Sequence, residues 1–95
     1  MLDKNKIVEI ARNIATANLT AAVTNVLVEP ATDSVGSDAL RSTIVIQPGA
    51  AARLSGDAVL DTLVQIQENL RANHEERFPI IEYATEEELQ SSGDS

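Results

Sequence analysis

The sequence has no cysteine and a single histidine among its 95 residues. The lack of cysteine excludes disulfide bonds, thiolate nucleophiles and zinc sites built on cysteine. The one histidine, His74, cannot form the histidine pair of the HExxH type of metal site. A lone histidine near the end of a helix usually complements the helix dipole, so we interpret His74 as structural. The sequence therefore predicts no metal site and no cofactor.

Aromatic residues are almost as scarce, since Phe78 and Tyr83 are the only two. With 43% hydrophobic residues, the core has to be built from Ile, Leu, Val and Ala. These side chains bury less area per residue than aromatic ones do. A single small core of this kind gives the folded state only a small margin of stability. Small domains often gain further stability by oligomerising.

No hydrophobic run is long enough to cross a bilayer, and the first residues lead directly into an amphipathic pattern. We therefore expect a cytoplasmic protein without membrane contact. Basic residues are also few, and the formal net charge is −8. The region 75–95 holds seven acidic side chains against Arg77 alone. Such a block repels nucleic acid and attracts basic partners, although it also serves simply to keep a chain in solution. Its candidate partner surface is Glu86, Glu87 and Glu88.

Apolar spacing and turn residues predict the elements of the fold. Asp3 begins a helix that ends near Asn18, and Ser55 caps a second helix. Thr85 and Glu88 match a capping box, which predicts a short C-terminal helical turn. The predicted strands are 24–29, 40–46 and 78–84, the first of them ending before Pro30.

The resulting order is α-β-β-α-β, which predicts a single two-layer α+β domain over residues 1–90 with a three-stranded sheet. Residues 91–95 are expected to form a frayed acidic tail. The second and third strands should run parallel because a helix connects them. We expect Leu63 and Ile66 at the centre of an aliphatic core.

The predicted strands are apolar on both faces, whereas a sheet with one face in water usually alternates apolar and polar residues. The surplus apolar positions are Leu27, Val45, Ile81 and Tyr83. Either the first helix covers them, with the second helix on the other face, or a second chain does. We interpret these four residues as a candidate protein interface.

Catalytic patterns are missing from the sequence. Its serines lie in no G-x-S-x-G or S-x-x-K motif, and its glycines form no phosphate-binding loop. Asp57 and Asp61 lie one helical turn apart, but paired acid–base chemistry requires carboxyl groups in different environments. We assign no catalytic residue and expect the protein not to be an enzyme.

The leading hypothesis is an interaction protein. It would be a homodimer, or the acidic half of a bacterial pair with a basic second protein, such as an antitoxin-like inhibitor. One alternative is a nucleic-acid-binding module, because the element order resembles that of type II KH domains. The sequence has no GxxG loop and no basic stripe, and its acidity disfavours nucleic acid. The other alternative is a minimal enzyme whose inter-subunit site uses Arg41, Arg77 and carboxylates.

Overall fold

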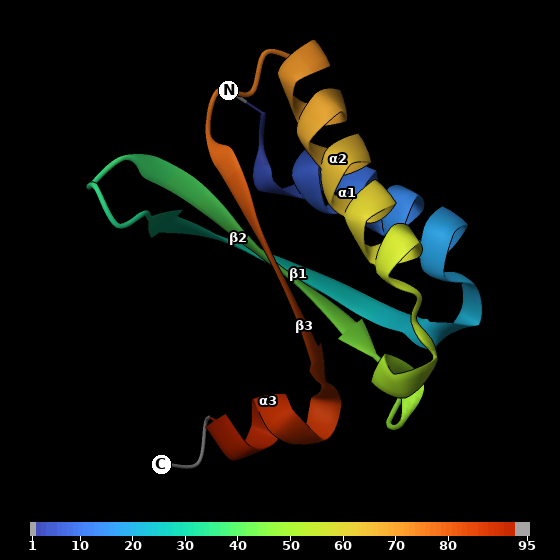
Figure 1. The fold of residues 1–95 in the computed structure, drawn as a ribbon. Helices are drawn as coiled ribbons and strands as arrows, with labels where there is room; N and C mark the ends of the chain where they lie inside the picture. Colours follow the sequence, from blue (N-terminus) through green and yellow to red (C-terminus); the bar gives the residue numbers. More distant parts are fainter. Residues whose placement is uncertain (1, 93–95) are drawn as a thin grey trace.

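The computed structural model describes residues 2–92, which form a three-stranded sheet with two long helices and a short terminal one (Figure 1). The predicted order α-β-β-α-β and the α+β fold class are confirmed. In chain order the elements are α1 (Lys4–Leu19), η1 (Thr20–Ala22), β1 (Val23–Thr32), β2 (Asp38–Ile46), η2 (Ala50–Arg53), α2 (Gly56–Ala72), β3 (Phe78–Thr85) and α3 (Glu86–Ser92).

The sheet has the strand order β1-β2-β3, with β2 in the centre. β1 and β2 form an antiparallel hairpin in which Thr32 pairs with Asp38. β2 and β3 are parallel, and Ala39 pairs with Phe78. The prediction of a parallel second and third strand is therefore confirmed. It follows from the connection through α2, which returns the chain to the end of the sheet where β2 began.

β1 is longer than the sequence predicts, since it continues through Pro30 to Thr32. The prediction that it ends before Pro30 is wrong because β1 is an edge strand. A proline at an edge costs no ladder hydrogen bond when its nitrogen faces away from the neighbouring strand.

α1 and α2 lie side by side on one face of the sheet, which makes a two-layer fold (Figure 1). The larger core cluster joins residues of both helices to the sheet. Its buried members are Ile7, Ala11, Val26, Val28, Leu40, Ile66 and Leu70. The arrangement with one helix on each face, considered from the sequence, is therefore not the one adopted.

The inward line of α2 consists of Thr62, Ile66 and Leu70, which are spaced four residues apart and fully buried. Ile66 is at the centre of the core as predicted, but the same prediction for Leu63 is wrong because Leu63 is only half-buried. Thr62 takes an inward place because its hydroxyl donates to the Ala58 carbonyl at 2.8 Å. That bond satisfies the polar group within the helix, so the rest of the side chain packs as an apolar one would.

The ends of the helices are built as the capping patterns predict. The Asp3 and Ser55 side chains accept the N–H groups of Lys6 and Ala58. Thr85 and Glu88 form the reciprocal bonds of a capping box at the start of α3. α3 continues through residue 92, so two residues of the predicted tail are helical, and residues 93–95 lie outside the described residues. No helix within the described range has the length and apolarity needed to cross a membrane.

Candidate functional site: the outer flank of α2 and the edge of β3

α2 carries two large apolar side chains that face solvent. Leu60 is 56% exposed and Val64, one turn later, is 40% exposed. Leu63 is half-buried beside them. On the other side of the helix, Gln65 accepts a hydrogen bond from Asn18 of α1. Because Leu60 and Leu63 lie on the side opposite Gln65, this apolar flank of α2 points away from α1 and towards β3.

β3 is an edge strand, and its outer edge has no strand partner among residues 2–92. Such an edge presents unpaired N–H and C=O groups to an incoming strand. The opposite edge of the sheet is interrupted by Pro30 and by a bulge between Val23 and Asn25. β3 has its proline at the second position, so the segment 80–84 keeps every N–H group, while the Thr85 N–H is bonded to Glu88. The free edge of β3 is therefore better suited than that of β1 to accept a strand.

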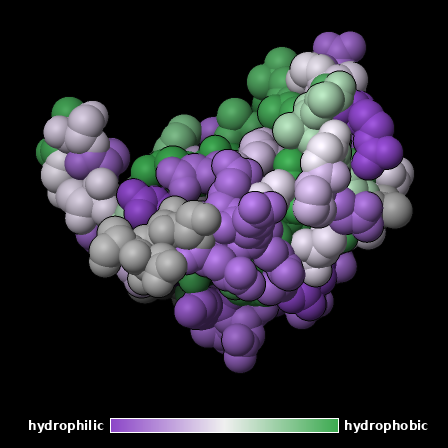
Figure 2. Space-filling model, turned by 90° about the horizontal axis from the view of Figure 1, so that it is seen from below, coloured by the Kyte–Doolittle hydropathy of each residue, from purple (hydrophilic) through white to green (hydrophobic). Residues whose placement is uncertain are grey.

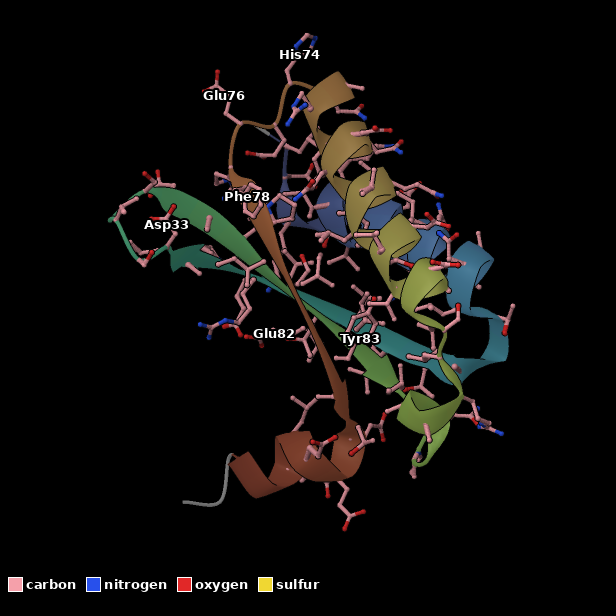
Figure 3. The ribbon with its side chains drawn as sticks, in the orientation of Figure 1. Asp33, His74, Glu76, Phe78, Glu82 and Tyr83 are labelled. Carbon is pink, nitrogen blue, oxygen red and sulfur yellow. The ribbon has the colours of Figure 1, made fainter. Side chains whose placement is uncertain are left out.

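Two side chains of β3 connect the edge to α2. Ile81 and Tyr83 are half-buried and pack against the core clusters on the helix side of the sheet. Figure 3 shows Tyr83 directed towards α2 and Glu82 directed to the opposite face. On that face Glu82 lies 3.7 Å from the Arg41 guanidinium. We call Leu60, Leu63, Val64, Ile81 and Tyr83 the α2/β3 surface.

Tyr83 carries a buried hydroxyl that has no partner in hydrogen-bonding geometry within the described part of the chain. Burial raises the pKa of Tyr83, and the nearby Thr62 hydroxyl partly offsets this rise. Thr62 stands close enough to influence the phenol, but its own proton is given to the Ala58 carbonyl. Tyr83 is therefore neutral near pH 7.

The four predicted interface residues divide between the two faces of the sheet. Ile81 and Tyr83 join the α2/β3 surface. Leu27 and Val45 alternate with the helix-facing residues of their strands and so point to the opposite face. There Leu27 is 42% exposed, whereas Val45 is only 1% exposed.

The sequence analysis did not single out Leu60 and Val64, because both fall within a broad apolar stripe along α2. A signal was available in the width of that stripe. A helix on one sheet needs an apolar arc of about 100°. The apolar residues of α2, from Val59 through Leu70, cover considerably more of its circumference.

The three predicted acidic residues occupy the first turn of α3. Glu88 accepts from the backbone N–H of Thr85 at 3.0 Å and so has a structural role. Glu86 and Glu87 are exposed. In the view from below, hydrophilic surface covers the centre and bottom, and hydrophobic residues gather towards the top (Figure 2). The acidic residues Glu86 and Glu87 belong to α3, whereas the α2/β3 surface is formed by α2 and β3.

A polar depression of about 520 Å³ lies between the β1–β2 turn and the α2–β3 connection. It is lined by Ser37, Asp38, His74, Glu75, Glu76 and Arg77. His74 adopts a left-handed φ of 65° at the end of α2. The Glu75 N–H that follows donates to the Leu70 carbonyl at 2.8 Å, which closes the helix in a Schellman-type turn. This backbone role accounts for the conformation of His74.

Glu75 is the most strongly perturbed group of this depression. Its side chain is buried and 3.0 Å from the Arg77 guanidinium. It also accepts the backbone N–H groups of Leu2 and Arg77, each at 3.0 Å. Hydrogen bonds from Arg77 lower the pKa of Glu75 to about 2, although burial opposes the shift. The carboxylate is thus fully engaged in joining the N-terminal segment to the α2–β3 connection.

These contacts leave little chemistry for the depression to perform. Arg77 is paired with Glu75, and Arg41 is paired with Glu82. The two arginines considered for an inter-subunit active site therefore have structural partners. Among the residues that the structure describes, no three His, Asp or Glu side chains are grouped as metal ligands would be.

No protein-family model, curated protein or solved structure matches this chain.

Proposed function

We propose that the protein acts by binding another protein chain through the α2/β3 surface, as a non-catalytic cytoplasmic interaction protein. One observation carries this proposal. The exposed side chain of Leu60 and the half-buried side chain of Leu63 lie on the flank of α2 opposite Gln65, on the side of the strand whose outer edge is free. Apolar side chains provide burial energy, and a strand edge provides directional hydrogen bonds.

The charge of the molecule supports a protein as the bound partner. A net charge of −8 opposes binding to nucleic acid, which is the main alternative from the element order. The sequence between Leu60 and Val64 also contains only one acidic residue, Asp61. A surface of this kind suits an apolar protein face with a strand at its border.

Site-specific photo-crosslinking in cells tests the proposal. A benzophenone amino acid replaces Leu60 in one variant and Val35 in a control variant. Val35 is 83% exposed at the tip of the β1–β2 turn, remote in sequence from α2 and β3. We expect a discrete crosslinked species from position 60 and none from position 35. Equal labelling at both positions, or none at either, would contradict the proposal.

A further inference from the structure

We infer that the partner on the α2/β3 surface is an extended segment of a different protein, in which aliphatic residues alternate with basic ones, and that this segment pairs with the outer edge of β3 as a fourth strand. The inference rests on the proposed function and specifies the chemistry of its partner. It follows from the width of the helix layer, from the burial of side chains at the two edges of the sheet, and from the charges along β3.

The helix layer of this fold is wider than its sheet. α1 and α2 lie side by side on one face of the sheet (Figure 1). Two helices, each about 10 Å wide, that pack side by side form a layer about 20 Å across. Strands about 4.8 Å apart give a three-stranded sheet about 14 Å across and a four-stranded sheet about 19 Å across. The two helices therefore leave room for one strand more than the sheet contains.

The uncovered part of the helix layer lies beside β3. On β1, the helix-facing side chains of Val26 and Val28 are fully buried. On β3, the helix-facing side chains of Ile81 and Tyr83 are only half-buried. α2 exposes 56% of Leu60, whereas α1 exposes no large apolar side chain within residues 2–92. The space for a fourth strand is therefore at the outer edge of β3 and not at that of β1.

An added strand at this edge would have one apolar face. Successive side chains of a strand point to opposite faces of the sheet. Those on the helix side would lie beside Ile81 and Tyr83, near Leu60, where a polar side chain would be buried without a partner. Branched aliphatic residues fit this position and also favour an extended backbone. The outward N–H and C=O groups of residues 80–84 supply the hydrogen bonds to the added backbone.

The other face of an added strand would meet acidic side chains. Glu82 points to this face (Figure 3), is half exposed and lies 3.7 Å from Arg41. Glu86 and Glu87, which follow β3 directly, are exposed, and β3 itself contains no basic residue. A basic side chain opposite Glu82 is therefore attracted, and an acidic one is repelled. No stretch of this chain alternates basic with aliphatic residues, so the segment belongs to a different protein.

An NMR titration of the isotopically labelled full chain with synthetic peptides tests the inference. The probe is a peptide in which valine alternates with lysine. The control peptide has the same composition, with all its lysines in one block. We expect the alternating peptide to shift the amide signals of residues 80–84, Leu60 and Leu63, and to bind at least about 10-fold more tightly than the block peptide.

A charge reversal distinguishes the two edges of the sheet. Glu82→Lys should weaken binding of the alternating peptide about 5-fold or more, because it replaces an attraction with a repulsion. Glu29→Lys is the matched control. Glu29 lies opposite Arg41 on β1 and is exposed, so this variant makes the same change of net charge beside the same arginine at the other edge. It should change the affinity by less than about 2-fold, because salt screens a charge at that distance.

Several results would overturn the inference. They are equal binding of the two peptides, shifts confined to other elements, and equal losses from the two variants. Shifts of residues 80–84 that follow the concentration of the protein without any peptide would also overturn it, because a second copy would then occupy the edge. A protein that crosslinks through position 60 in cells, together with no binding of the alternating peptide, would leave the proposed function standing and exclude this partner chemistry.

Discussion

The Glu75 carboxylate links segments that are far apart in the sequence, from Leu2 to Arg77. Its folded-state pKa of about 2 lies below the ordinary value of 4.5. A depressed carboxylate pKa stabilises the folded state at pH values above the ordinary pKa, and this contribution is lost as the pH falls towards the folded pKa. We therefore predict that Glu75→Gln lowers the free energy of unfolding by roughly 2–3 kcal/mol at pH 7.

Urea titrations of both proteins at pH 7, 4 and 2.5 measure this effect. The difference between wild type and Glu75→Gln should be full at pH 7, begin to shrink below pH 4.5 and become small near pH 2. The neighbouring exposed Glu76 provides the control, because Glu76→Gln removes the same charge without touching Arg77. A difference at pH 2.5 as large as that at pH 7 would mean that Glu75 contributes by packing and not by its charge.

At the scale of the helix, the rotation of α2 about its own axis determines which of its side chains are buried in the core. Ile66 is completely buried, whereas Leu63 is half-buried on the flank. We predict that Ile66→Ala lowers the free energy of unfolding by about 3–4 kcal/mol. Leu63→Ala should cost less than about 2 kcal/mol, because less of its surface is removed from water.

Urea denaturation at concentrations where the chain is monomeric separates the two variants. Leu60→Ala serves as the exposed reference and should change stability by less than about 0.5 kcal/mol. Equal losses for Ile66→Ala and Leu63→Ala would show that α2 is rotated relative to the arrangement described above.

The elements themselves could largely be predicted from the sequence because their signals are local. Asp3, Ser55 and the Thr85–Glu88 pair satisfy backbone groups within one helical turn, so their spacing is sufficient to identify them. The connection through α2 likewise forced β2 and β3 to be parallel.

The candidate site could not be predicted as well because it depends on how the elements face one another. Hydropathy alone favoured Leu63 for the core, whereas the inward place belongs to Thr62, whose hydroxyl is satisfied by Ala58. Similarly, β2 is apolar on both faces, so its pattern did not show that both helices share one of them. Leu60 and Val64 became visible as surface residues only once the side of α2 that meets α1 was known.

At the scale of the whole molecule, the net charge of −8 affects any association between copies. Two acidic chains repel one another over distances that salt screens, with a Debye length of about 10 Å at 0.1 M. We predict that raising the salt concentration from about 0.05 to about 0.5 M tightens self-association about 3- to 10-fold. Sedimentation equilibrium at each salt concentration measures this change. A complex with a basic protein would show the reverse trend, because salt would screen an attraction.

The parallel pairing of β2 with β3 also has a consequence for the order of folding events. The β1–β2 hairpin closes across a short turn in which Asp33 accepts the N–H groups of Val35 and Ser37. β3 reaches the sheet only after the chain has passed through η2 and the whole of α2. Contacts between residues distant in sequence form slowly because loop closure costs entropy before any contact compensates for it. We expect the docking of β3 to limit the folding rate. The strand whose outer edge is free is then the last to reach its place in the sheet.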